Sequence, residues 1–569
     1  MRRQLEETID WRHNRKVSLS LFSCLFCTLI LTVPQSLFSG EIDVNLESDP
    51  LAVSAGSLVI CGGGVLPPKL IDRFVELGGG PKARIVVVSS ASVFADQDIH
   101  VRLSGWYDRL ADGGITSIDV LHTRTREEAD APHFSKMLET ATAVWFLGGN
   151  QNWLSQVYLG TMTEERMHGV LKRGGVIGGT SAGAAIMSRC MIAGGKNEAM
   201  LSTGLGFLPG TIVDQHFLKR NRMDRLMHAL QLRPGMVGIG IDEATALVVR
   251  GRTLEVIGDS DALVCLSPSQ HRPARIEKLG AGHQADLVTL RRAAVARAES
   301  ASIATTKSSV PAVQNGTLII VGGGRTPPEV VDSFLTAAGG KEAPIIVVSN
   351  ALSDTPPELT SVGDWLKAAG ASNVHLLHAT SKEELSNPGL VSLLKEARGV
   401  WFTGGGQWRL VDAYLGTKVE ELFHDVLRRG GVIGGTSAGA TIQGEYLVRG
   451  NPLGKEEMIT EGYERGFGFL PGVAIDQHFT QRSRQSDMAQ LKKAHPELVG
   501  LGIDEATAMI VRGSTMRVIG QHEVTVFDRP SNASAETPEF AVLKSGEAYD
   551  FREHRRMELA SSDGDAPTK

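Results

Sequence analysis

Two short glycine-rich segments contain the residues whose types and spacing could do covalent chemistry. Gly179-Thr180-Ser181-Ala182-Gly183 follows an apolar run, and the same five residues return at 435–439. The spacing Gly-x-Ser-x-Gly at a strand-to-helix turn is typical of a nucleophilic serine held on a sharp bend. A helix that begins there would direct backbone N–H groups at a developing oxyanion. A glycine-rich packing turn, in which the serine only caps the helix, would have the same sequence.

A serine nucleophile needs a base, and each segment is followed by one candidate. His216 lies in Asp-Gln-His-Phe at 214–217, and His478 lies in the same four residues at 476–479. The base in turn needs an orienting acid. Both copies of Gly-Ile-Asp-Glu-Ala-Thr-Ala offer two neighbouring acids, of which only one can face the histidine if the segment is a strand. The acids are Glu243 and Glu505, with Asp242 and Asp504 as the competing choices.

Arginines follow both histidines at short intervals. A guanidinium group binds two carboxylate oxygens at once, so these arginines indicate an anionic substrate, although a charged helix face would show the same pattern. In the second copy the ninth residue after the histidine is Asp487, and this charge reversal puts substrate binding at that site in doubt. The arginines are Arg220, Arg222 and Arg225 in the first copy, and Arg482 and Arg484 in the second.

The motifs occur twice because the chain is a tandem repeat. The segment Arg173–Ala184 returns unchanged as Arg429–Ala440. The 569 residues of the chain suffice for two domains of ordinary size. We predict domains at 52–293 and 313–557. An Ala-, Ser- and Thr-rich linker at 294–312 would join them, and a polar tail would follow at 558–569.

Short apolar runs alternate with helical patterns in each repeat. In the first repeat the runs lie at 58–61, 85–88, 143–147 and 175–179, and they end in glycine or serine. This alternation predicts an α/β fold with a mainly parallel sheet flanked by helices. Chemistry in such sheets collects at the carboxyl ends of the strands, where both serines would lie.

The first forty residues form a separate segment. Residues 1–16 carry five basic side chains, and residues 17–33 carry no charge and are mostly apolar. This order indicates an export signal at 1–40, with a retained membrane anchor or a misassigned start as alternatives. We therefore expect the protein to be exported, to a periplasm or outside the cell, or to be anchored in the membrane.

Composition excludes several classes of function. A net charge of −6 gives no general attraction to nucleic acid, and five cysteines are too few to hold a disulfide scaffold of this length. No group of histidines and cysteines has metal-ligand spacing. The Gly-Gly-Gly runs at 62–64 and 322–324 lack the dinucleotide-binding spacing. The sequence thus predicts no metal and no cofactor.

Together the motifs resemble the cyanophycinase branch of peptidase family S51. The resemblance covers 55–293 and 315–557 and rests on Gly-Thr-Ser-Ala-Gly-Ala, the Asp-Gln-His-Phe-x-x-Arg-x-Arg segments, and the turns Gly-Gly-Asn-Gln at 148–151 and Gly-Gly-Gly-Gln at 404–407. The family is related to aspartyl dipeptidase and has a class I glutamine-amidotransferase-like, flavodoxin-like fold. Its usual aspartate in the turn is Asn150 here and Gly406 in the second repeat. The chain order Ser, His, Glu argues against a lipase or esterase.

The resemblance implies roles for residues in both repeats. The implied catalytic residues are Ser181, His216 and Glu243, and Ser437, His478 and Glu505. The implied oxyanion donors are Gly149 with Ala182, and Gly405 with Ala438. The implied substrate-binding residues are Gln151, Asp214, Gln215, Arg220, Arg222 and Arg225, and Gln407, Asp476, Gln477, Arg482 and Arg484.

The resemblance implies a serine peptidase that hydrolyses aspartyl peptide bonds, and the N-terminal segment predicts that it is exported. The expected reaction is release of β-Asp-Arg dipeptides from cyanophycin, a poly-aspartate with arginine on its side chains. One alternative is a dipeptidase or exopeptidase acting on other Asp-containing peptides, and another is a non-catalytic binding protein. A non-catalytic binding protein could lose a catalytic residue from either repeat, but both repeats retain all three. Single-domain relatives are expected to form dimers, so we expect the two repeats to pair within the chain as a pseudo-dimer.

Overall fold

The structure is a computed structural model that describes residues 52–53, 55–97, 103–299, 310–529 and 539–557. The predicted export signal or anchor at 1–40 and the polar tail at 558–569 lie outside the described residues. Within the described ranges, no helix combines the length and apolar character needed to cross a membrane.

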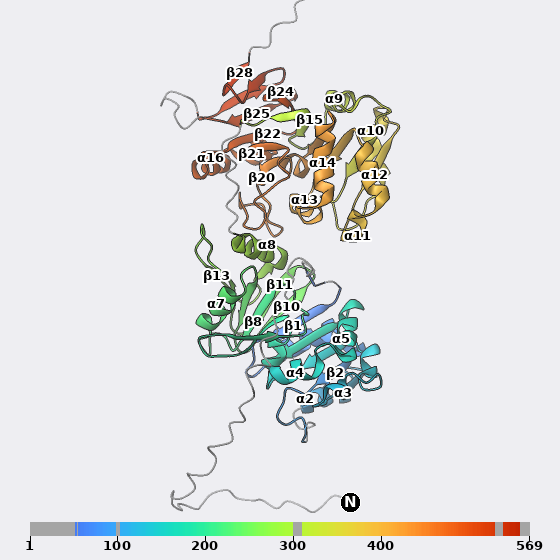
Figure 1. The fold of residues 1–569 in the computed structure, drawn as a ribbon, viewed down its shortest axis with the longest axis vertical. Coiled ribbons are helices and arrows are strands. Elements are labelled where there is room, and N and C mark those ends of the chain that lie inside the picture. Colours follow the sequence, from blue (N-terminus) through green and yellow to red (C-terminus); the bar gives the residue numbers. More distant parts are fainter. Residues whose placement is uncertain (1–51, 54, 98–102, 300–309, 530–538, 558–569) are drawn as a thin grey trace, which may run out of the picture. The chain divides into compact units, whose positions relative to one another are not determined.

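The first repeat contains an eight-stranded sheet in the order β14-β11-β10-β1-β5-β4-β2-β3 (Figure 1). Strands β1, β5, β4, β2 and β3 run parallel, whereas β10, β11 and β14 extend the sheet by antiparallel pairing. This confirms the predicted α/β fold with a parallel core. The strands are β1 (Ser57–Cys61), β2 (Arg84–Val88), β3 (Ser117–Leu121), β4 (Ala143–Phe146), β5 (Val176–Thr180), β10 (Thr245–Arg250), β11 (Thr253–Gly258) and β14 (Gln284–Asp286).

Helices cover both faces of this sheet, as its continuous apolar strands require. On one face Phe74 of α1 packs edge-on against Trp145 of β4, with ring centroids 4.8 Å apart. On the other face Val86 and Phe146 belong to the same core as Leu154 of α4. The helices of the first repeat are α1 (Pro68–Leu77), α2 (Ser104–Ala111), α3 (Arg126–Ala129), α4 (Gln151–Tyr158), α5 (Met162–Lys172), α6 (Ala182–Ala185), α7 (Met223–Leu232) and α8 (Leu287–Ala298).

A second, smaller sheet completes the first repeat. Its order is β13-β12-β9-β8, with β8 (Thr211–Gln215) and β9 (Val237–Ile241) parallel and β12 (Ala262–Leu266) and β13 (Arg275–Leu279) added antiparallel. Strands β6 (Cys190–Gly194) and β7 (Met200–Thr203) form a separate hairpin. Apolar runs and turn residues do not reveal which strands share a sheet, so the sequence did not predict this division.

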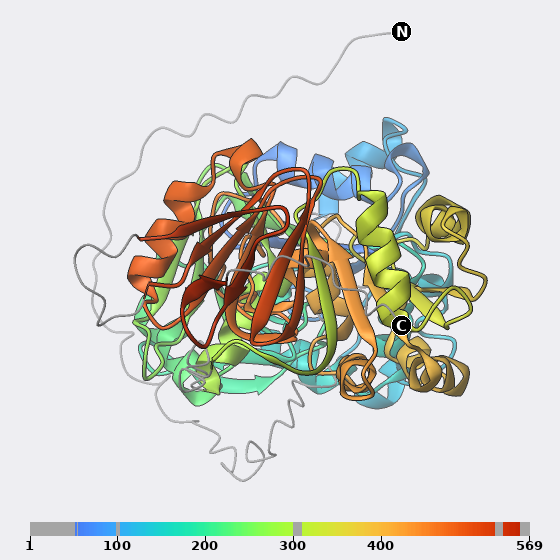
Figure 2. The ribbon, with the colours of Figure 1, turned by 90° about the horizontal axis from the view of Figure 1, so that it is seen from above.

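The second repeat has the same plan, with a nine-stranded sheet in the order β17-β16-β18-β19-β15-β23-β24-β27-β28 and a five-stranded sheet in the order β20-β21-β22-β25-β26. Figure 2 shows the last strands of the chain in red, with α16 in orange along one side. The strands are β15 (Val313–Val321), β16 (Ile345–Val348), β17 (Val374–Leu377), β18 (Gly399–Phe402), β19 (Val432–Thr436), β20 (Gly444–Tyr446), β21 (Leu470–Gln477), β22 (Val499–Ile503), β23 (Thr507–Gly513), β24 (Thr515–Gly520), β25 (Glu523–Phe527), β26 (Ala541–Lys544), β27 (Ala548–Asp550) and β28 (Arg555–Met557). The helices are α9 (Pro328–Ala338), α10 (Leu359–Ala368), α11 (Lys382–Leu385), α12 (Pro388–Glu396), α13 (Gln407–Tyr414), α14 (Lys418–Arg428), α15 (Ala438–Thr441) and α16 (Gln485–Ala494).

The expected linker at 294–312 begins too early, because residues 294–298 belong to helix α8. The side chain of Asp286 caps this helix by accepting a hydrogen bond from the Thr289 amide at 2.7 Å. The alanines that made the segment look like a linker are also strong helix formers. Residues 300–309 of the predicted linker lie outside the described residues.

Charged contacts join α8 and its neighbours to the second repeat. Arg297 donates to Glu461 at 2.5 Å, and Arg292 donates to Asp412 at 2.9 Å. Arg252 also donates to Asp412, at 2.8 Å. All three arginines belong to the first repeat and both acids to the second, and the pairing of the repeats as a pseudo-dimer stays a prediction.

Candidate active site

Both candidate serines lie on a strained bend between a strand and a short helix. Ser181 follows β5 and precedes α6 with φ 56° and ψ −109°, and Ser437 follows β19 with φ 54° and ψ −111°. A positive φ is unfavourable for a residue with a Cβ and is found mainly where the surrounding structure imposes it. Gly179 permits the bend, because a Cβ there would lie 2.6 Å from the Gly183 carbonyl oxygen.

The histidines follow strands of the smaller sheets and point at the serines. His216 Nε2 lies 2.9 Å from Ser181 Oγ, and His478 Nε2 lies 3.0 Å from Ser437 Oγ. Both histidines also have positive φ, at 52° and 50°. Their backbone N–H groups donate to glycine carbonyls that follow β1 and β15, so the larger sheet anchors the end of each smaller-sheet strand.

Glutamate, not aspartate, contacts the histidine in each repeat. His216 Nδ1 lies 2.7 Å from Glu243 Oε1, and the corresponding distance to Glu505 Oε1 is 2.5 Å. Asp242 instead accepts hydrogen bonds from the Lys219 amide and the Ser260 hydroxyl, both at 2.9 Å. The aspartate therefore fixes the loop after the histidine, which answers the question that the sequence left open.

A glycine turn lies beside each serine. A Cβ on Gly149 would lie 1.9 Å from the Ala91 carbonyl oxygen, and one on Gly405 would lie 2.0 Å from that of Ala351, so only glycine fits either turn. Within the described residues, neither the Gly149 nor the Ala182 amide donates a hydrogen bond. Both amides are thus available to an oxyanion.

Gln151 and Gln407 begin the helices that follow these turns. The Gln151 side-chain amide donates to the Ile192 and Ala193 carbonyls, both at 3.0 Å, and thereby holds strand β6. Asn150, where the family has aspartate, still caps α4 by accepting from the Asn152 amide at 3.0 Å, whereas Gly406 offers no side chain to α13. Gln151 thus positions strand β6, and Gln407 the segment after β20, with the side-chain amides that we expected to contact substrate.

The arginines after the histidines divide into buried and exposed ones. In the first repeat Arg222 and Arg225 both pair with the fully buried Asp214, and Arg222 also donates to the Gln215 side chain at 3.0 Å. Arg220 and Arg482 are exposed. The two exposed arginines are therefore the ones open to a substrate carboxylate, whereas Arg222, Arg225, Asp214 and Gln215 are occupied by contacts with one another.

The buried acid of the second repeat has a different pair of arginine partners, and Asp487 is part of this difference. Arg484 pairs with the buried Asp476, as Arg222 does with Asp214. The second partner of Asp476 is Arg449, which comes from the segment after β20 and also donates to Asp487 at 2.8 Å. Arg449 therefore pairs with Asp487, and the negative charge of Asp487 is no longer a reason to doubt substrate binding at the second site. Gln477 of this repeat keeps a buried side-chain oxygen without a partner among the described residues.

The surroundings of both histidines favour the neutral form of the imidazole. Burial lowers the pKa of His216 below its ordinary value, and the positive charges of Arg220 and Arg222 lower it further. The hydrogen bond to Glu243 opposes this shift. His478 has a lowered pKa for the same reasons, so each imidazole can accept a proton from the neighbouring hydroxyl.

Sequence reasoning missed the function of the Gly-Gly-Gly runs. A Cβ on Gly63 would lie 2.3 Å from His216 Cε1, and one on Gly323 would lie 2.3 Å from His478 Cε1. The next glycine packs on the glutamate, because a Cβ on Gly64 would lie 3.0 Å from the Glu243 side chain. The repetition of three glycines after the first strand was the available signal.

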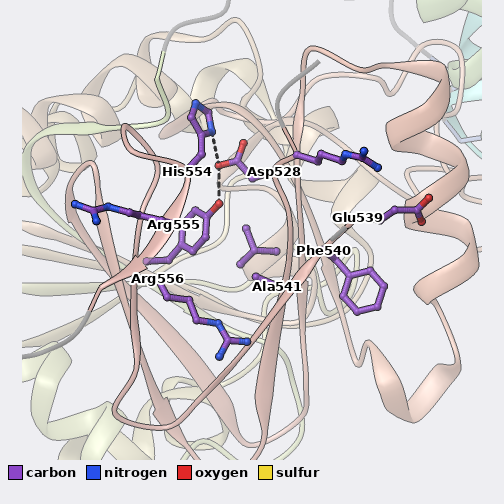
Figure 3. Close-up of a pocket in the computed structure, with 10 residues that line it drawn as sticks. Asp528, Glu539, Phe540, Ala541, His554, Arg555 and Arg556 are labelled. Atoms are coloured by element: carbon purple, nitrogen blue, oxygen red, sulfur yellow. Dashed lines mark hydrogen bonds and ion pairs between the residues drawn. The ribbon is translucent and has the colours of Figure 1, made fainter. Parts of the chain in front are cut away.

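No metal-binding group of acids, histidines and cysteines occurs among the described residues. A separate cavity of about 330 Å³ lies among the last strands of the second repeat (Figure 3). Inside it, Asp528 accepts hydrogen bonds from His554 at 2.9 Å and from the Tyr549 hydroxyl at 3.2 Å. Because these groups satisfy one another and none belongs to the serine sites, we assign no chemistry to this cavity.

Comparison with known proteins places both repeats in one family. The family model described as peptidase family S51 matches residues 58–257 and 318–519. A cyanophycinase of Synechococcus elongatus is 38% identical over 199 residues, which are 33% of this chain and 61% of the relative. Cyanophycinases of Geminocystis herdmanii and of a Nostoc species are 36% and 35% identical, over 77% and 74% of their lengths.

A solved structure is also similar. The crystal structure of a peptidase from an acI-B1 actinobacterium is 22% identical, and the match covers 41% of this chain and 97% of that one, with a TM-score of 0.33. The family model alone covers more than half of the present chain, once in each repeat. The chain therefore belongs to peptidase family S51, as two tandem copies.

Proposed function

We propose that each repeat is a serine peptidase. The observation that supports this most directly is the hydrogen-bonded series from serine to histidine to glutamate in both repeats. The serine–histidine distances are 2.9 and 3.0 Å, and the histidine–glutamate distances are 2.7 and 2.5 Å. Two copies of the same arrangement, each on a strained backbone, favour catalysis over a binding role.

In the proposed mechanism, His216 Nε2 takes the proton of Ser181 as Oγ attacks the substrate carbonyl carbon. The Gly149 and Ala182 amides donate to the resulting oxyanion. Collapse of the tetrahedral intermediate breaks the C–N bond, and the histidine gives its proton to the leaving amine. Water then attacks the acyl-enzyme by the same route, and Glu243 stabilises the imidazolium in both halves of the reaction.

We further propose that the scissile bond follows an aspartyl residue. Arg220 and Arg482 are exposed next to the histidines, and a guanidinium pairs well with a substrate carboxylate. The relatives named cyanophycinase suggest cyanophycin as the polymer and β-Asp-Arg dipeptides as the products. The chain spans about three fifths of the first relative, so this substrate is carried over as a proposal.

Hydrolysis by single-site variants tests the proposal. Cyanophycin and a panel of Asp-X dipeptides would be incubated with the wild type, with Ser181→Ala, with Ser437→Ala and with the double variant. Release of β-Asp-Arg by the wild type and not by the double variant is the expected result. Cleavage of the dipeptides alone would favour a dipeptidase, and undiminished activity of the double variant would refute a serine mechanism.

We also propose that the protein is exported through its N-terminal segment. The support is the basic start followed by an uncharged, mostly apolar run at 17–33. Expression with a C-terminal tag, fractionation and N-terminal sequencing of the product would test this. A shortened product outside the cytoplasm is expected, whereas a full-length protein in the cytoplasm would refute it.

A further inference from the structure

A fully buried carboxylate lies two residues before each catalytic histidine. Asp214 and Asp476 have no exposed surface. A charge at such a position is tolerated only when cationic partners and hydrogen bonds replace the water it has lost. In the first repeat Arg225 of α7 supplies one partner, and its Nη1 also donates to the Gly195 carbonyl beside β6 at 2.9 Å. Arg225 thus ties the helix, the buried acid and the neighbouring hairpin together.

In the second repeat an arginine from a different element occupies this place. Arg449 Nε donates to both oxygens of Asp476, at 3.2 and 3.0 Å. Its Nη1 donates to the Lys455 carbonyl at 2.8 Å, and its Nη2 donates to Asp487 of α16 at 2.8 Å. Arg449 therefore ties together the same three parts of the site, but from the segment after β20 and not from the helix.

The glutamines identify the position in the first repeat that matches Arg449. Gln407 donates to the carbonyls of Val448 and Arg449, at 2.9 and 2.7 Å. Gln151 donates in the same way to those of Ile192 and Ala193. Arg449 thus corresponds to Ala193, while Asp487 corresponds to Arg225. In the second repeat the arginine that pairs with the buried acid thus lies at the position of Ala193, and the position of Arg225 holds an aspartate.

We propose that Arg449 is a positioning residue of the second site and does there what Arg225 does in the first. Its side chain fixes Asp476 before His478, and its carbonyl holds Gln407 after the oxyanion turn. It is 4% exposed and adopts φ 56°, a strained conformation for a non-glycine residue. This inference rests on the proposed peptidase function, and it predicts that the second site is as competent as the first.

The test moves the arginine back to the helix. In the Ser181→Ala background, which leaves only the second site, Arg449→Ala should lower kcat about ten- to 100-fold, because the site loses its support. Arg449→Ala combined with Asp487→Arg should restore most of the rate. Asp487→Arg alone should not raise kcat, because Arg449 already pairs with Asp476. Labelling of Ser437 by a fluorophosphonate provides a second rate that needs no natural substrate.

Two controls separate positioning from general stability. Tyr549→Phe removes one donor from Asp528, another buried carboxylate of the same repeat, and should leave the labelling rate unchanged. In the Ser437→Ala background, Arg225→Asp with Ala193→Arg should build the arrangement of the second site in the first and retain most activity. If Arg449→Ala does not fold, the labelling rate of the double variant Arg449→Ala with Asp487→Arg still tests the proposal.

Three results would overturn the proposal. The first is labelling of Arg449→Ala at the wild-type rate. The second is a restored double variant that folds but stays slow, and the third is equal slowing by Tyr549→Phe. Failure of the proposed function would look different, because the wild type would cleave no Asp-containing substrate although the labelling rates still responded to Arg449.

Discussion

A methyl group on Gly63 should disable the first site without unfolding the repeat. The added Cβ would lie 2.3 Å from His216 Cε1 and 2.6 Å from Nε2, whereas ordinary contact begins at 3.4 Å. The imidazole would have to retreat by about 1 Å, and a displacement of that size can cost about 100-fold in rate. We therefore expect Gly63→Ala, in the Ser437→Ala background, to lower kcat/KM at least about 100-fold.

The strain of the substitution needs its own control. Gly63 has φ 110°, and alanine in that conformation costs about 1–3 kcal/mol wherever it occurs. Gly79 of the same repeat has φ 109°, but its added Cβ would meet nothing closer than 3.8 Å. Gly79→Ala should thus lose similar stability in thermal unfolding and keep its kcat/KM. A folded Gly63→Ala with wild-type kcat/KM, or an equal loss in Gly79→Ala, would refute the steric argument.

Three further predictions concern charged residues, two of them at the first site and one between the repeats. Glu243→Gln should lower kcat of the first site about 10³-fold or more, measured with Ser437→Ala present, because the amide cannot stabilise the imidazolium; a small loss would contradict this role. Arg220→Ala removes a positive charge that lowers the pKa of His216, so the acid limb of the kcat/KM profile, which lies below the ordinary histidine pKa of about 6.5, should move to higher pH. A limb that stays in place or moves to lower pH would contradict that assignment. Glu461→Arg should loosen the contact between repeats in small-angle scattering and limited proteolysis, because the new side chain would face Arg272, Arg275 and Arg297 of the first repeat, and an unchanged scattering and proteolysis profile would contradict this.

The sequence was informative wherever a motif recurred in both repeats. The parallel core could be inferred from the alternation of apolar runs and helical patterns, and the pairing of Ser181 with His216 from the recurrence of both motifs in each repeat. That the two residues follow strands of different sheets, β5 and β8, could not be inferred. The choice of Glu243 over Asp242 could not, since it depends on which side of a strand end each side chain takes.

Other features depend on contacts that leave no local pattern. Arg449 lies in the segment after β20, far in sequence from the helix that contains Asp487, and only the folded structure shows that its side chain contacts both Asp487 and the buried Asp476. The early end assigned to the first domain has a related cause. Small residues at 294–298 look like a linker by composition, but a capped helix whose last arginine pairs with Glu461 gives them a fixed place.

The positive φ angles at the serines and histidines have an evolutionary consequence. Each such residue costs about 1–3 kcal/mol, and glycine at the same position would relieve most of it. A repeat released from selection for activity would therefore gain stability by drifting to glycine at Ser437 or His478. Both positions retain their side chains at φ 54° and 50°. The second repeat thus retains two strained residues that a repeat without selection for activity would be expected to lose.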